Sequence, residues 1–358
     1  MMLTIPTRAE VVRQVRERGE RVAAVLPIHY PRALLRAHGF QPMEVWGPPS
    51  VSVVEGNAHF QAYTCGIVRN ATSFLLQGGL DAADVIVIPH TCDALQGMAS
   101  VLKDFIEPRQ PVATIYLPRA ARSADRGFLQ AELHRLAQQL AEISGRSPSG
   151  GELMAAIERE EEADRELGAL AEHRSEIDLG DRDYFTLLRA REFLPAESFI
   201  ELARSAPRGR GPDRGVPLMI SGIVPEPMDL FDHINEMGAH VVADDLACCS
   251  RRLYRPGSAS DPFERMADAL LGGPLDPTRG SPILERARAV ASRMAQCGAK
   301  GLLVYDVKFC EPELFDVPLL RKHLTEAGLS MLHVEFDMTG SIAQQTLTRI
   351  EAFVEMLQ

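Results

Sequence analysis

Two stretches decide the fold of this chain: residues 85–93 read VIVIPHTCD, and residues 301–310 read GLLVYDVKFC. Each starts with a short apolar run rich in β-branched residues, which is typical of a buried parallel strand. Each then ends in a polar segment that carries a cysteine, Cys92 in the first and Cys310 in the second. Both stretches therefore predict a strand whose carboxyl end leads directly to a cysteine.

The same alternation of strands and helices runs through both halves of the chain. Further strands are predicted at Val22–Leu26, Met43–Trp46, Val112–Leu117, Leu218–Ser221, His240–Ala243 and Met331–Phe336. Helices are predicted at Arg32–His38, Val68–Gln77, Ala94–Phe105, Met228–Met237, Ile283–Cys297, Pro318–Ala327 and Ser341–Leu357. This order predicts α/β architecture with parallel, doubly wound sheets of the Rossmann or flavodoxin type.

The middle of the chain has a different pattern. From about Phe128 to Ala206 it is helical and strongly charged, and Ser149 with Glu152 forms a capping-box signature. The run EREEE at 158–162 is expected to be a solvated helix face. Pro207–Pro217 resembles a linker, and its glycines precede a strand, which excludes a dinucleotide-binding loop. We expect two doubly wound domains at 1–126 and 207–358, joined by a helical insert at 127–206.

Composition narrows the class of protein. The chain has 358 residues, 46% of them hydrophobic and 24% charged, which is ordinary for a globular protein of two domains. A net charge of −11 argues against a nucleic-acid surface. No apolar run is long enough for a membrane helix, and Met1–Glu20 lacks a secretory apolar core. A cytoplasmic protein without membrane or nucleic-acid partners is expected.

Six cysteines are present, and none forms a Cys-x-x-Cys pair: Cys65, Cys92, Cys248, Cys249, Cys297 and Cys310. Cys92 and Cys310 follow strands, and Cys65 lies just before a helix. Parallel sheets bind ligands at such corners, and helix N-termini stabilise the thiolates that bind metal. Cysteine is also a common buried apolar residue, so a shared metal site and simple packing are about equally favoured for these three.

The remaining cysteines favour other roles. Cys297 falls on the apolar face of a predicted helix, which favours packing. Cys248 and Cys249 are adjacent, and neighbouring side chains rarely converge on one metal, so a structural or partner-facing role is expected. Asp244 and Asp245 follow a strand, where they could act as acid–base groups or support a metal ligand, and capping of the next helix is favoured for one of them.

Several segments together resemble a known family. They are Pro31–Gly39 with Pro42, His90-Thr91-Cys92-Asp93, Val241–Asp245 with Ser250-Arg251, Lys308-Phe309-Cys310, and Thr348–Phe353. In this order they resemble subunits of 2-hydroxyacyl-CoA dehydratases and of the related ATP-dependent benzoyl-CoA reductases. The resemblance spans nearly the whole chain and is weakest in the charged helical insert.

The resemblance implies a cofactor and partners. Cys65, Cys92 and Cys310 would hold a [4Fe-4S] cluster with one iron left open, and a double-cubane cluster is the less expected alternative. A paralogous subunit would pair with the chain, and a separate ATP-hydrolysing iron–sulfur activator would deliver one electron. The substrate would be an acyl-CoA or aryl-CoA thioester. The chain lacks a Gly-x-x-x-x-Gly-Lys-Ser/Thr loop, which fits the use of ATP by another polypeptide.

The leading functional expectation is a subunit of a radical lyase that dehydrates 2-hydroxyacyl-CoA. The alternatives are an aryl-CoA reductase subunit and a non-catalytic scaffold paired with a catalytic paralogue. Four residues are expected beside the cluster, where they would tune it: His90, Asp93, Lys308 and Asp245. Arg251 is expected to bind a CoA phosphate or a partner carboxylate, or to lie on the surface.

Overall fold

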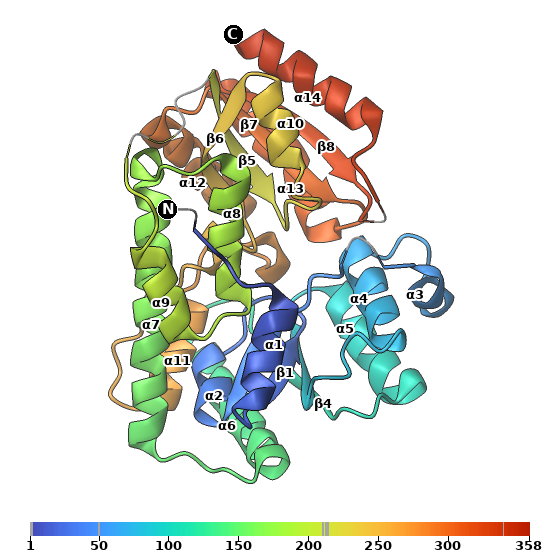
Figure 1. Ribbon diagram of the computed structural model, residues 1–358, viewed down its shortest axis with the longest axis vertical. Coiled ribbons are helices and arrows are strands. Elements are labelled where there is room, and N and C mark those ends of the chain that lie inside the picture. The colour runs from blue at the N-terminus through green and yellow to red at the C-terminus, as the bar shows by residue number, and fades with distance from the viewer. Residues whose placement is uncertain (1–2, 49–50, 210, 212–214, 339) are drawn as a thin grey trace.

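The computed structural model describes residues 3–48, 51–209, 211, 215–338 and 340–358, and within them two four-stranded parallel sheets form (Figure 1). The first has the order β2-β1-β3-β4, with β1 (Arg21–Val25), β2 (Phe40–Glu44), β3 (Val85–His90) and β4 (Val112–Tyr116). The second has the order β6-β5-β7-β8, with β5 (Val216–Gly222), β6 (Ala239–Leu246), β7 (Gly301–Val307) and β8 (Ser330–Phe336). The expected α/β fold is confirmed.

Both faces of each sheet are covered, which explains why the strands are continuously apolar. In β3, Val85 and Val87 face one apolar cluster, while Ile86 and Ile88 face another. The first cluster lies under α2 (Arg32–Ala37) and the helical segment, and the second under α1 (Arg8–Glu17), α4 (Gly66–Leu76) and α5 (Asp93–Val101). The second cluster continues into the other sheet, so one core joins the two sheets.

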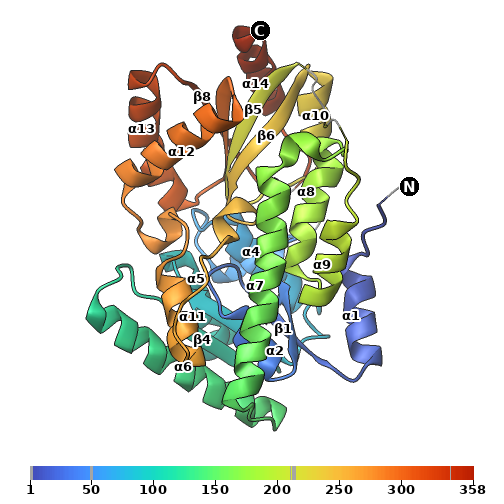
Figure 2. The same cartoon turned by 90° about the vertical axis from the view of Figure 1, so that its left-hand side faces the viewer.

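The second sheet is enclosed in the same way. Helices α10 (Leu230–Glu236) and α14 (Gln344–Leu357) cover one face, and α12 (Ile283–Cys297) and α13 (Glu311–Glu326) cover the other (Figure 2). Helix α13 begins seven residues before the predicted start at Pro318, directly after Cys310. Pro312 in its first turn is compatible with this start because a backbone N–H is not needed there.

The helical segment contains α6 (Ser123–Ser144), α7 (Gly150–Glu172), α8 (Asp181–Arg189) and α9 (Ala196–Arg204). The capping box at Ser149 and Glu152 is confirmed, because each residue accepts a backbone N–H of the other. The expected solvated face is wrong at Glu160. This side chain is buried and accepts hydrogen bonds from Arg191 and Arg32, because α2 and α9 both pack against α7.

Helix α11 (Pro262–Leu271) belongs to the second half of the chain but packs against α6 and α7 (Figure 2). Its Met266 and Leu270 share an apolar cluster with Leu129 of α6 and with the first sheet. The expected limits at residues 126 and 206 stay predictions. In the linker, residues 210 and 212–214 lie outside the described residues, while Gly209 and Gly211 donate backbone hydrogen bonds to Glu176 and Ser175. Within the described ranges no helix is long and apolar enough to cross a membrane.

Candidate functional site

Three of the cysteines line the same space. Cys65, Cys92 and Cys310 occupy the N-cap positions of α4, α5 and α13. All three line an open cavity of about 600 Å³ and also a small internal cavity of about 40 Å³. The structure thus brings together segments from both halves of the chain around three thiols.

The three thiols influence one another's protonation. Burial raises the pKa of Cys65, raises that of Cys92 to about 12, and raises that of Cys310 well above its usual value. Cys65 adds to the pKa increase of Cys92, and both add to that of Cys310, because neighbouring thiolates repel. Without a bound cation the three groups are therefore protonated at neutral pH.

Helix N-termini supply the opposite influence. The backbone N–H groups of Ile67 and Val68 lower the pKa of Cys65, and those of Ala94 and Leu95 lower that of Cys92. Among the described residues, no three His, Cys, Asp or Glu side chains are grouped so that they could hold a single metal ion. Three thiols spread around one cavity instead suit a larger group with several thiolate ligands.

The two cavities differ in character. The internal one is apolar, with Ile28, Trp46 and Leu95 in its walls. The open one has aromatic residues at its rim, and the side chains of Tyr63 and Phe315 are 61% and 71% exposed. The three thiols therefore line both a small, largely apolar cavity and a larger cavity with exposed aromatic side chains.

The residues expected beside the cysteines lie in different environments, and only some of them line a cavity with the thiols. Asp93 lines the open cavity with Cys92. His90 packs edge-on against Tyr116, with 4.3 Å between ring centroids, and lines neither cavity. Lys308 is exposed, and its Nζ lies 5.6 Å from the ring centroid of Phe309. The tuning roles of His90, Asp93 and Lys308 stay predictions.

Asp245 lies in a different environment. Its Oδ2 accepts hydrogen bonds from Ser221 and from Nη2 of Arg286, each at 2.8 Å. It lines a separate cavity beside Arg251 and Arg286, and neither of the two cavities at the thiols. Its expected place beside the cluster stays a prediction without support from this geometry.

Asp244 and Arg251 have structural contacts. Asp244 accepts the N–H groups of Leu246 and Ser250 at 3.0 and 2.9 Å, so it bonds the first N–H of the short helix at Ser250–Arg252, although Cys249 holds the N-cap position. The surface role considered for Arg251 is wrong. Its side chain is 2% exposed and lies 3.1 Å from Asp276 and 2.6 Å from Glu313, because the strand ends around it enclose a buried ion-pair network.

Sequence reasoning missed His29, Tyr254, Asp276 and Thr278. His29 follows β1 with a left-handed backbone (φ 63°), a conformation that is uncommon for non-glycine residues. Its ring is hydrogen-bonded to Tyr254, and its Nε2 lies 3.7 Å from Asp276. Thr278 donates its backbone N–H to Asp276 and lines both cavities at the thiols. Only the position of His29 after a strand was a usable sequence signal.

Comparison with known proteins identifies the family of the chain. The chain is 28% identical over 359 residues to the lactoyl-CoA dehydratase subunit beta of Anaerotignum propionicum, an alignment covering 95% of this chain and 93% of that protein. It is 27% identical to the (R)-2-hydroxyglutaryl-CoA dehydratase subunit beta of Acidaminococcus fermentans, with 95% and 93% covered. It is 26% identical to a benzoyl-CoA reductase subunit of Thauera aromatica, with 95% and 92% covered. Residues 27–357 match the family described as 2-hydroxyglutaryl-CoA dehydratase, D-component, and the chain belongs to that family.

Proposed function

We propose that this chain is one subunit of a lyase that removes water from 2-hydroxyacyl-CoA thioesters. Membership of the dehydratase family supports this function, and two of the relatives are named as dehydratase beta subunits. The observation that carries the proposal is the convergence of Cys65, Cys92 and Cys310 on one cavity at three helix N-termini.

Family membership suggests an iron–sulfur cofactor, and we infer that it is a [4Fe-4S] cluster held by these three thiolates. Among the residues that the structure describes, no fourth cysteine lines either cavity, which favours three protein ligands. Cys248 and Cys249 are buried side by side with their sulfurs 3.6 Å apart and do not line these cavities, so they give no support to a double-cubane cluster. When bound, such a cluster supplies one-electron transfer and an open iron that polarises a substrate oxygen.

The protein's own contribution is the environment of that group. Each cysteine must release its proton to become a ligand, and the N–H groups of the first turns of α4 and α5 stabilise the resulting thiolates. Ile28, Trp46 and Leu95 give one side of the thiols an apolar surrounding, which disfavours water there. Exclusion of water strengthens electrostatic interactions and protects reactive species there.

The partners follow from the same proposal. The relatives named as beta subunits support a paralogous partner subunit, and an ATP-hydrolysing iron–sulfur activator would supply the electron. The relative named as a benzoyl-CoA reductase subunit keeps the aryl-CoA reductase as the second candidate. Assays with partner and activator separate the two, because a dehydratase gives an enoyl-CoA without net reduction. Full turnover by the partner alone would instead indicate a scaffold.

Iron and acid-labile sulfide analysis after anaerobic purification tests the cluster. The Cys92→Ser and Cys310→Ser variants should lose most of their iron and their EPR signal after reduction. Cys297→Ser is the matched control, because Cys297 lies at the end of α12 outside both cavities. Full iron content in the first two variants would reject the proposed ligands.

A further inference from the structure

Aromatic side chains line the open cavity together with the three thiols. Phe60 and Tyr63 come from the segment between α3 (Val54–His59) and α4. Phe309 precedes α13, and Phe315 lies within it. Each half of the chain therefore contributes two aromatic residues to one cavity. Its volume of about 600 Å³ falls in the range of cavities that bind small molecules, roughly 300–1,000 Å³.

Two of these aromatic side chains are largely exposed. Tyr63 and Phe315 are 61% and 71% exposed, whereas the other two are half-buried. Pro282, Ile283 and Pro312 extend the apolar part of the lining. Exposed apolar residues grouped beside a cavity are typical of a surface that binds a ligand or a partner. An apolar group that enters this cavity can pack against aromatic rings from both halves of the chain.

The charged residues of the open cavity are mostly acidic. Among the described residues, one arginine and three carboxylates line it, which leaves two negative charges: Arg119, Asp93, Glu311 and Asp316. Asp316 lies 3.0 Å from Arg286, whose side chain does not line this cavity. If Asp316 is set aside because Arg286 balances its charge, one negative charge still remains. The cavity therefore opposes a second anionic group.

The other polar residues of the lining carry no charge. They are the hydroxyl-bearing residues Thr64, Thr91, Thr278 and Ser281. Hydroxyl groups can form hydrogen bonds with the thioester and alcohol oxygens of a ligand. They do not neutralise a carboxylate, and a carboxylate that loses water without gaining a counter-charge is strongly disfavoured.

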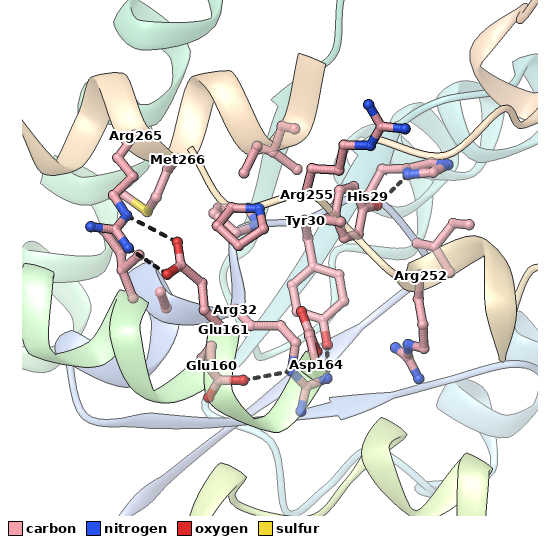
Figure 3. Close-up of a pocket in the computed structure, with 18 residues that line it drawn as sticks. His29, Tyr30, Arg32, Glu160, Glu161, Asp164, Arg252, Arg255, Arg265 and Met266 are labelled. Atoms are coloured by element: carbon pink, nitrogen blue, oxygen red, sulfur yellow. Dashed lines mark hydrogen bonds and ion pairs between the residues drawn. The ribbon is translucent and has the colours of Figure 1, made fainter. Parts of the chain in front are cut away.

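A neighbouring set of arginines does not change this balance. It lines a separate pocket, shown in Figure 3, and consists of Arg32, Arg252, Arg255 and Arg265. This pocket shares Ile28 with the small internal cavity and no residue with the open cavity. Within it, Arg265 pairs with Glu161, and Arg32 donates to Glu160 (Figure 3). These four arginines therefore offer no counter-charge in the open cavity.

We propose that the open cavity binds 2-hydroxyacyl-CoA thioesters whose acyl side chain is uncharged and apolar, with an aryl or branched alkyl end against its four aromatic residues. An acyl side chain that ends in a carboxylate is rejected by the acidic lining. In this position the thioester and 2-hydroxyl oxygens stay in the same cavity as the thiols.

The inference rests on the proposed function for the identity of the ligand as a 2-hydroxyacyl-CoA thioester. It adds the class of acyl side chain and the residues that select it. Membership of the family does not decide this point, since one relative is named for lactoyl-CoA and another for (R)-2-hydroxyglutaryl-CoA.

Equilibrium binding to the anaerobically purified holoprotein tests the proposal without turnover. The probes are 3-phenyl-2-hydroxypropanoyl-CoA, 2-hydroxypropanoyl-CoA and 2-hydroxyglutaryl-CoA, which differ only in the acyl side chain. The phenyl compound should bind about tenfold more tightly than 2-hydroxypropanoyl-CoA, because an aromatic ring is removed from water. The glutaryl compound should bind most weakly of the three. Tighter binding of 2-hydroxyglutaryl-CoA than of 2-hydroxypropanoyl-CoA would overturn the proposal.

Removal of the two exposed rings tests the aromatic residues. The double variant Tyr63→Ala/Phe315→Ala should lose most of the preference for the phenyl compound and bind 2-hydroxypropanoyl-CoA as the wild type does. Phe105→Ala is the matched control, because Phe105 is 77% exposed and lines neither cavity at the thiols. A double variant that keeps the preference but loses its partner subunit would show a protein interface instead and would overturn the proposal.

Removal of one acid tests the charge. Glu311→Gln should strengthen the binding of 2-hydroxyglutaryl-CoA roughly threefold, because one repelling charge is lost. Glu326→Gln is the control, since Glu326 is exposed at the far end of α13 outside both cavities, and it should have no effect. Equal effects of the two substitutions would contradict the role of the acidic lining.

The same titrations separate this proposal from the proposed function. If none of the three thioesters binds more tightly than free CoA, the proposed function is rejected together with the inference. If all three bind tightly but with equal affinity, only the inference is overturned. Iron content is measured on every sample, so loss of the cluster is recognised independently of the binding result.

Discussion

The hydroxyl of Tyr254 is hydrogen-bonded to Nδ1 of His29, although the two residues are 225 positions apart in the chain. The contact joins the end of β1 to the segment that precedes α11. Asp276 extends it, since Nε2 of His29 lies 3.7 Å from Oδ1 of Asp276 and Oδ2 of Asp276 lies 3.1 Å from Nη1 of Arg251. These buried polar side chains therefore link the end of β1 to the segments around Asp276 and Arg251.

Removal of Arg251 should destabilise the fold strongly. Arg251→Ala leaves the carboxylates of Asp276 and Glu313 buried without their main counter-charge. A loss of about 3–5 kcal/mol in the free energy of unfolding is expected from such a change. Arg109→Ala removes an exposed pair with Asp81 and should cost less than about 1 kcal/mol in the same denaturant titration. Similar losses in the two variants would show that the buried network is not stabilising.

The Glu160 ion pairs should make stability depend on pH. Burial alone would raise the pKa of Glu160, but the charges of Arg191 and Arg32 hold it at about 2, below the ordinary 4.5. A lowered folded-state pKa contributes stability that is complete above the ordinary value and is lost as pH falls towards 2. The full contribution of Glu160 to the free energy of unfolding is about 3 kcal/mol.

Urea unfolding of the wild type and of Glu160→Gln tests whether Glu160 stabilises the fold more at neutral pH than at acidic pH. The variant should be less stable at pH 7, and the difference should shrink by roughly 2 kcal/mol at pH 3, where part of the contribution is lost. Glu197→Gln removes a half-exposed partner of Arg159 and is the control, with a small effect at both pH values. A Glu160→Gln difference that is equal at the two pH values would contradict the ion-pair account.

The end of β5 should tolerate no side chain. Gly222 has φ +142°, and an added Cβ would lie 2.2 Å from the carbonyl oxygen of Tyr305. Gly222→Ala should lower the free energy of unfolding by more than about 2 kcal/mol. Gly127→Ala, in α6 with open space around the position, should instead be neutral or stabilising by up to about 1 kcal/mol. Thermal unfolding of both variants measures the difference, and equal shifts would refute the steric argument.

Release of iron should be favoured by acid. The pKa of each of the three thiols is raised by burial, so protons compete with the metal for these ligands. Iron captured by a chelator under anaerobic conditions should therefore increase between pH 8 and pH 6. Release that does not change with pH would argue against thiolate ligation at these positions.

Local features of the sequence were sufficient for much of the fold. The strands before Cys92 and Cys310 are continuous apolar runs because both faces of each sheet are buried, and such runs are visible in one chain. The position of these cysteines at strand ends also predicted corners where parallel sheets bind ligands, although β3 and β7 belong to two different sheets. Long-range packing was not predictable: Glu160 is buried only because α2 and α9 cover α7.

The candidate site shows the same contrast between residues with a local sequence signal and residues that only tertiary packing brings together. Each of the three cysteines carries a local signal, since Cys92 and Cys310 follow predicted strands and Cys65 lies just before a predicted helix. The partners of His29 have no such local signal, because Tyr254 and Asp276 lie in irregular segments and contact His29 only through the tertiary fold. Family resemblance supplied the chemistry that spacing alone did not.

The iron and sulfide content of the Cys65→Ser variant tests the central claim most directly. Cys65 has the least distinctive sequence context of the three proposed ligands, and the structure places it on both cavities with Cys92 and Cys310. The account predicts roughly four iron atoms per chain in the wild type and in Cys297→Ser. It predicts loss of most iron and sulfide from Cys65→Ser, with the fold retained by circular dichroism. A folded Cys65→Ser protein with wild-type iron and sulfide would contradict the three-thiolate cluster.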